Sequence, residues 1–136
     1  MYKVLFVCVG NAARSQMAAA YFNHLSGSRA GAESAGTVPA SRVDPAVIKL
    51  MQEDGIDISS AVPKLLTQDM LASTNRVVTM GCGAENACPA KCIATEDWGL
   101  VDPKGKPVEE VRQIRADIKR RVTQLLEVIR MEEKTK

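Results

Sequence analysis

The stretch from Val4 to Ser15 constrains the fold of this chain more than any other part of the sequence. It opens with an apolar run, Val4-Leu5-Phe6-Val7, which is typical of a buried parallel strand because both faces of such a strand are covered. The run ends at Cys8, five residues separate Cys8 from Arg14, and a helical pattern starts at about Ser15. The sequence therefore predicts a strand, a short loop and a helix in direct succession.

The short loop has the residue types of an oxyanion site. Successive N–H groups in such a loop form a concave anion nest, and the helix N-terminus adds its unpaired N–H groups and positive dipole end. Gly10 allows a tight bend or a positive φ, and Asn11 is the non-glycine type that best tolerates one. Arg14 can place two N–H groups on two oxygens of a tetrahedral anion. The predicted binding loop is Val9, Gly10, Asn11, Ala12, Ala13, Arg14 and Ser15.

Cys8 lies at the base of this predicted cradle. The field that holds an anion also favours thiolate over thiol, so we predict a thiolate nucleophile beneath a bound phosphate-like oxyanion. The alternative is a cysteine that is merely buried at a strand end, since cysteine is among the most buried residue types. The glycine, asparagine and arginine that follow Cys8 in this strand-to-helix context favour the catalytic interpretation.

The rest of the chain alternates strands and helices. Segments 32–35, 76–80 and 93–98 read as further strands, and segments 15–25, 65–72 and a segment opened by Asp44-Pro45 read as helices. The last helix carries apolar residues at spacings of three and four, at Val111, Ile114, Ile118, Val122, Leu125 and Ile129. We therefore predict one α/β domain over residues 1–136, with a four-stranded parallel sheet flanked by helices.

Composition excludes several classes of protein. The 136 residues have a formal net charge of +2, which is too small to indicate nucleic acid or a membrane surface as a partner. No apolar run approaches the ~20 residues of a membrane span, and the N-terminus enters a strand without a signal peptide. We therefore expect a cytoplasmic, monomeric protein without a cofactor.

Residues 8–17, Cys-Val-Gly-Asn-Ala-Ala-Arg-Ser-Gln-Met, resemble the signature loop of the low-molecular-weight protein tyrosine phosphatase superfamily. The resemblance is closest to its thioredoxin-coupled arsenate reductase branch, because Ala13 stands where the phosphatases usually have a second cysteine. It implies a low-molecular-weight phosphatase-like fold and the reduction of arsenate, in arsenic detoxification, with electrons from thioredoxin or a similar dithiol. The main alternative is a phosphatase that hydrolyses phosphate monoesters through a phosphocysteine.

Three more cysteines, Cys82, Cys88 and Cys92, cluster in one glycine-containing segment. Unreactive thiols are one interpretation, and a zinc site is another, although the spacings differ from those of structural zinc hooks. The third is a redox relay, because a cysteine that follows the third strand lies at the same sheet edge as Cys8. The resemblance supports the relay and implies that Cys82 and Cys88 are its first and second thiols, with Cys92 as an alternative to Cys88.

Asp102-Pro103 resembles the general acid loop of the superfamily. A carboxyl group there can protonate a leaving oxygen, whereas the plainer interpretation is a turn aspartate before a proline. The nearby Trp98 either lines the pocket or packs in the core. The predicted catalytic residues are Cys8, Arg14, Cys82, Cys88 and Asp102.

Overall fold

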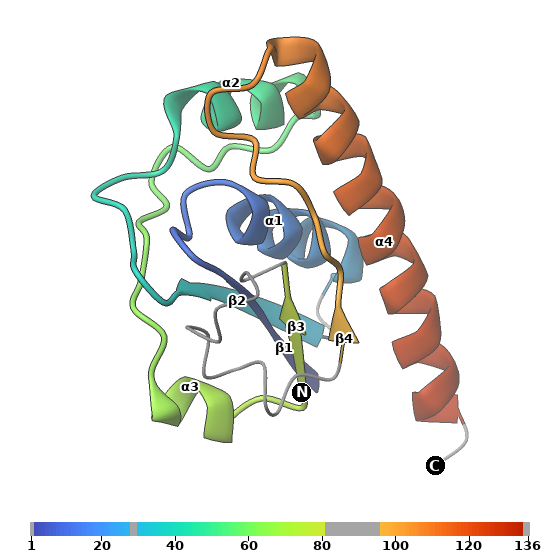
Figure 1. The fold of residues 1–136 in the computed structure, drawn as a ribbon. Helices are drawn as coiled ribbons and strands as arrows, with labels where there is room; N and C mark the ends of the chain where they lie inside the picture. Colours follow the sequence, from blue (N-terminus) through green and yellow to red (C-terminus); the bar gives the residue numbers. More distant parts are fainter. Residues whose placement is uncertain (1, 28–29, 81–95, 135–136) are drawn as a thin grey trace.

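A computed structural model describes residues 2–27, 30–80 and 96–134. Four parallel strands form one sheet in the order β2-β1-β3-β4 (Figure 1). Their bounds are Tyr2–Cys8 for β1, Ala30–Gly36 for β2, Arg76–Thr79 for β3 and Glu96–Asp97 for β4. The predicted α/β fold with a four-stranded parallel sheet is confirmed.

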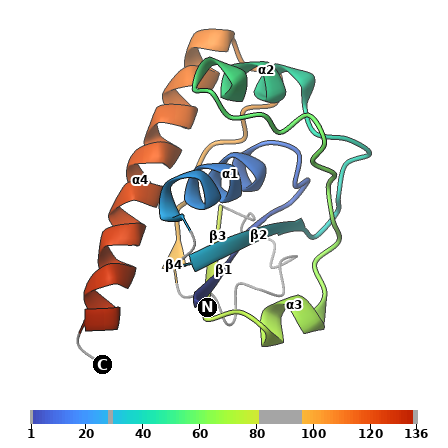
Figure 2. The same ribbon diagram turned by 180° about the vertical axis from the view of Figure 1, so that it is seen from behind.

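The strand alternation of β1 divides the core between the two faces of the sheet. Val4, Phe6 and Cys8 point into the larger cluster, whereas Leu5 and Val7 point into a smaller one on the opposite face. Helices α1 (Arg14–Ser26), α2 (Pro45–Glu53) and α4 (Val108–Lys134) cover the larger cluster, and the short α3 (Gln68–Ala72) lies against the other face (Figures 1 and 2).

The strand order places the end of β1 where ligands bind in such sheets. From β1 the chain moves to β2 on one side and then crosses back to β3 on the other, so the direction of winding reverses between β1 and β3. Ligands of open parallel sheets bind in the crevice at the carboxyl ends of the strands that flank such a reversal. The loop after Cys8 lies at this point.

One predicted helix begins later than the sequence indicates. The helix predicted over 65–72 begins only at Gln68, because the backbone before it pairs with β2 instead: the Gly36 amide donates to the Lys64 carbonyl, and the Leu66 amide donates to the Gly36 carbonyl. Of the strand predicted over 93–98, residues 96–98 are described, and Glu96–Asp97 form β4. The predicted loop with Cys82, Cys88 and Cys92 lies outside the described residues.

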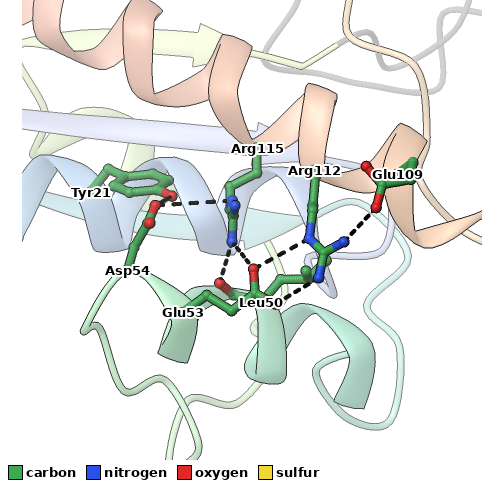
Figure 3. A network of polar contacts seen from close by, with 7 residues as sticks. All are labelled: Tyr21, Leu50, Glu53, Asp54, Glu109, Arg112 and Arg115. Atoms are coloured by element: carbon green, nitrogen blue, oxygen red, sulfur yellow. Dashed lines mark hydrogen bonds and ion pairs between the residues drawn. The ribbon is translucent and has the colours of Figure 1, made fainter.

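Helix α4 is fastened to α2 by a network of polar contacts (Figure 3). Arg112 donates to Glu53 at 2.9 Å, and Arg115 donates to Glu53 at 2.9 Å and to the Leu50 carbonyl at 2.6 Å. The Tyr21 hydroxyl of α1 donates to Asp54, which follows α2. Arg112 and Arg115 of α4 are thus held in ion pairs with Glu53 of α2.

Candidate functional site

Cys8 is a buried, free thiol at the carboxyl end of β1. Its Sγ lies 2.8 Å from the Ser15 hydroxyl and accepts a hydrogen bond of 3.1 Å from the backbone N–H of Asn11. These two groups are donors that suit a thiolate. The predicted cysteine and its predicted loop are therefore brought together around one sulfur atom.

Every carbonyl of residues 8–13 accepts a hydrogen bond from a residue outside this stretch. The chain after β2 supplies most donors: Thr37, Val38, Ala40 and Asp44 donate their amides to the carbonyls of residues 8, 9, 10 and 12. The Gln16 side chain donates to the Asn11 carbonyl, and the Met17 amide donates to the Ala13 carbonyl. Because its carbonyls are held by these donors, the loop can present its N–H groups to a bound anion.

Asn11 sets the turn of the loop. It has a φ of 50°, so the left-handed conformation falls on Asn11 and Gly10 has no positive φ. The fully buried side chain donates to the Ser15 hydroxyl at 2.7 Å and accepts from the Lys64 amide at 2.9 Å and from Gln16 at 3.1 Å. These bonds offset the cost of the backbone conformation and fix Ser15 beside Cys8.

Helix α1 begins at Arg14 without a side-chain cap, since Ala13 occupies the N-cap position. Because α1 directly follows the loop after Cys8, its unpaired N–H groups and the positive end of its dipole lie beside that loop. Arg14 Nη1 donates to the carbonyls of Met80 at 2.7 Å and Leu100 at 3.0 Å. Arg14 thereby joins the cradle to the end of β3 and to the loop that carries Asp102.

A pocket of about 630 Å³ opens above this cradle. Cys8, Arg14 and Asp102 all line it, so three of the predicted catalytic residues share one cavity. The Asp102 carboxylate accepts a hydrogen bond of 3.0 Å from the Lys104 amide, which holds the loop of Asp102 in a turn. The predicted loop residues that line the pocket are Val9, Gly10, Ala12, Ala13 and Arg14, whereas Asn11 and Ser15 lie buried behind them.

Other predicted residues fall elsewhere. Trp98 is buried with its ring 5.5 Å from that of Phe6 and donates to Glu96 at 2.7 Å, so it packs in the core and is not among the pocket residues. Cys82 and Cys88 lie outside the described residues. In the described ranges no group of three His, Cys, Asp or Glu is placed to hold a metal ion.

Two pocket residues were not predicted from the sequence. Arg42 lies in the chain between β2 and α2, and Lys104 lies between β4 and α4, yet both line the pocket with Cys8. An isolated cation in a loop carries no sequence signal, because only the fold shows which loops share a cavity.

The sequence matches the family described as low molecular weight phosphotyrosine protein phosphatase over residues 3–135. The chain belongs to this family. It is 39% identical over 127 residues to a putative arsenate reductase of Halobacterium salinarum, which covers 90% of this chain and 89% of that protein. The family is thus described by phosphotyrosine, whereas this relative is named for arsenate.

Solved structures of this family match along almost the whole chain. The structure of an arsenate reductase in the phosphate-binding state has a TM-score of 0.83 and 36% sequence identity, and the match covers 95% of this chain and 99% of that chain. A thioredoxin-dependent arsenate reductase of Corynebacterium glutamicum has a TM-score of 0.81 and 37% identity; the match covers 97% of this chain but 63% of that chain. Among the described residues no helix is long and apolar enough to cross a membrane.

Proposed function

We propose that this protein reduces arsenate to arsenite by a cysteine relay, with electrons from thioredoxin or a similar dithiol. The observation that carries the proposal is the position of Cys8, whose sulfur faces the Ser15 hydroxyl and the Asn11 amide at the base of the pocket. A thiolate held in this way is placed to attack a tetrahedral oxyanion bound to the loop and to Arg14.

In the first proposed step, Cys8 attacks the arsenic atom of arsenate. A sulfur–arsenic bond forms and an arsenic–oxygen bond breaks, and the oxygen leaves as water after protonation. Asp102 lines the same pocket and is the proposed acid for this proton transfer. The loop amides and Arg14 stabilise the negative charge of the oxyanion during this step.

In the second proposed step, the Cys82 thiolate attacks the sulfur of Cys8. The sulfur–arsenic bond breaks, its electron pair stays on arsenic, and As(V) becomes As(III) as arsenite while a Cys8–Cys82 disulfide forms. Cys88 then attacks Cys82, which returns Cys8 to its reduced state and leaves a Cys82–Cys88 disulfide for the external dithiol. Two thiols thus supply the two electrons, and the external dithiol replaces them.

The relatives support this substrate and this electron donor. The related protein of Halobacterium salinarum is named a putative arsenate reductase, and the related structure of Corynebacterium glutamicum is named thioredoxin-dependent. A cytoplasmic location belongs to the proposal, because the relay requires reduced thiols. The monomeric state stays a prediction, and Cys92 remains an alternative to Cys88.

A coupled assay tests the proposal: NADPH consumption is followed with thioredoxin and thioredoxin reductase while arsenate is added. We expect turnover that depends on arsenate and is lost in Cys8→Ser. The absence of turnover together with rapid hydrolysis of an aryl phosphate would contradict the reductase and support the phosphatase. That alternative rests on the same cradle, which suits phosphate and arsenate equally, and on the name of the family.

Single cysteine variants separate the roles of the thiols. Cys82→Ser should retain hydrolysis of an aryl phosphate, because only Cys8 and the cradle are needed for it, and should lose arsenate turnover. Cys88→Ser should allow one turnover and then stop with a Cys8–Cys82 disulfide. If Cys88→Ser turns over normally and Cys92→Ser does not, Cys92 is the third thiol.

A further inference from the structure

Arg42 and Lys104 line the pocket above Cys8 and are both exposed to solvent, so they form a cationic mouth to this pocket. Both side chains line the cavity that has Cys8 at its base, and they come from two loops that are far apart in the sequence. Along the described ranges neither residue makes an ion pair. In contrast, the arginines of α4 at positions 112, 115, 120, 121 and 130 all pair with carboxylates.

The loops that carry these two cations are held in place. The backbone on either side of Arg42 is bonded to the cradle, because the Ala40 amide donates to the Gly10 carbonyl and the Asp44 amide to the Ala12 carbonyl. Lys104 is fixed by its own amide, which donates to Asp102 at 3.0 Å. The helices that follow the two loops, α2 and α4, are joined through Glu53 (Figure 3).

The pocket is larger than its innermost ligand requires. The cavity has a volume of about 630 Å³, whereas one water molecule in the liquid occupies about 30 Å³, so the pocket has room beyond an oxyanion of five heavy atoms on the cradle. Apolar side chains, Val9, Val38 and Pro39 among them, also line the pocket. Two carboxylates also line the pocket, but Asp44 accepts from the Ala46 amide as a helix cap and Asp102 accepts within its turn.

We infer that Arg42 and Lys104 are specificity-determining residues that form an outer binding position for a tetrahedral oxyanion with two negative charges, which passes from there to the cradle. This inference rests on the proposed function. A charged position at the mouth raises the local concentration of the anionic substrate. It gives no such attraction to arsenous acid, which is uncharged near neutral pH, so the mouth favours entry of arsenate over retention of the product.

The test measures anion binding without turnover. Iodoacetamide is uncharged and alkylates the Cys8 thiolate, and a bound oxyanion protects it; the Cys8 peptide is followed by mass spectrometry while orthophosphate or arsenate is titrated. The variants are Arg42→Gln, Lys104→Gln and the double variant. Lys49→Gln is the matched control, since Lys49 is exposed on α2, makes no ion pair along the described ranges and does not line the pocket.

We expect each single variant to weaken phosphate and arsenate binding about threefold to tenfold at low ionic strength, and the double variant to weaken it further. Added salt should reduce the difference, because it screens exposed charges. Anion affinity in each variant is referred to that variant's own alkylation rate without anion, so that a change in the reactivity of the thiol is not counted as a change in binding.

Unchanged anion affinity in the double variant, or an equal loss in Lys49→Gln, would overturn the inference while leaving the reductase proposal intact. A wild-type protein that no oxyanion protects would overturn both. For arsenate turnover, the variants should raise KM and leave kcat within about twofold, whereas a loss confined to kcat would contradict an entry role.

Discussion

The Ser15 hydroxyl lies 2.8 Å from the sulfur of Cys8, and both groups are buried. The same hydroxyl oxygen accepts a hydrogen bond of 2.7 Å from the Asn11 side chain. Since Asn11 occupies the oxygen as a donor, the hydroxyl hydrogen is left to point at the sulfur. Ser15 is thereby set as a donor to a thiolate, which can only accept.

We predict that Ser15→Ala slows the reactions of Cys8. The loss of one hydrogen bond to a charged group costs about 1.5–3 kcal/mol, which corresponds to roughly a tenfold to hundredfold loss. The measurement is the rate of alkylation of Cys8 by iodoacetamide at neutral pH, together with hydrolysis of an aryl phosphate. Ser60→Ala is the control, because Ser60 is exposed and distant in sequence from the loop. Equal rates in Ser15→Ala and the wild type would contradict the role of the hydroxyl.

Gly36 lets the end of β2 approach the loop after Cys8. A Cβ placed on Gly36 would lie 2.5 Å from the carbonyl oxygen of Val9 and 3.0 Å from the backbone nitrogen of Asn11. Both neighbours are backbone atoms of the cradle, so the clash cannot be relieved by a side-chain rotation. We predict that Gly36→Ala lowers stability by about 1–3 kcal/mol and displaces the loop, with loss of anion protection of Cys8.

Gly10→Ala is the matched control for stability, because a Cβ on Gly10 would meet no atom within 4 Å and Gly10 has no positive φ. Urea unfolding of both variants gives the measurement. If Gly36→Ala is as stable as Gly10→Ala and binds phosphate normally, the predicted clash between position 36 and the loop is wrong.

Local patterns in the sequence predicted the parts of the site that lie on one stretch of chain. The apolar run, the cysteine and the arginine identify β1, the loop and α1, because each depends on residues within a few positions. The helix cap at Asp44 was predicted for the same reason, and in the structure the Asp44 carboxylate accepts from the Ala46 amide. The apolar stripe of α4 was likewise predicted from the spacing of neighbouring residues.

Parts of the site that depend on distant segments were not predicted. The carbonyls of the loop are held by amides from residues 37–44, and backbone amides are the same in every non-proline residue, so no side-chain pattern marks them. Arg42 and Lys104 meet only at the pocket. Leu65 and Leu66 read as helical from their residue types, but tertiary pairing with Gly36 outweighs that local preference.

Glu53 gives the junction of α2 and α4 a pH dependence. Hydrogen bonds from Arg112 and then Arg115 lower the pKa of Glu53 to about 2. In the unfolded chain a glutamate titrates near ~4.3, so the folded protein binds this proton less readily than the unfolded one. The contribution of Glu53 to stability is therefore fully present above that unfolded value and is lost as the pH falls toward 2.

We predict that Glu53→Gln lowers the thermal unfolding midpoint at pH 7, and that the difference from the wild type shrinks as the pH falls below the unfolded value. The size of the effect is modest, because the ion pairs are partly exposed and are screened by salt. Glu33→Gln is the control, since Glu33 makes no ion pair in the described ranges and lies in β2. A midpoint difference that is independent of pH would contradict the assignment to the Glu53 charge.

Asp102 offers a test of the acid step that does not depend on the identity of the substrate. Its carboxylate lines the pocket with Cys8, and among the described lining residues Asp44 has the only other carboxylate. Asp102→Asn keeps an acceptor for the Lys104 amide but removes the transferable proton. We predict that the variant hydrolyses phenyl phosphate about 10²–10⁴-fold more slowly, because phenolate is a poor leaving group that needs protonation. The loss should be much smaller for p-nitrophenyl phosphate, whose leaving group is stable as an anion.

Asp69→Asn, on the exposed first turn of α3, should hydrolyse both esters at the wild-type rate. Equal losses for the two esters in Asp102→Asn would show that Asp102 only shapes the loop.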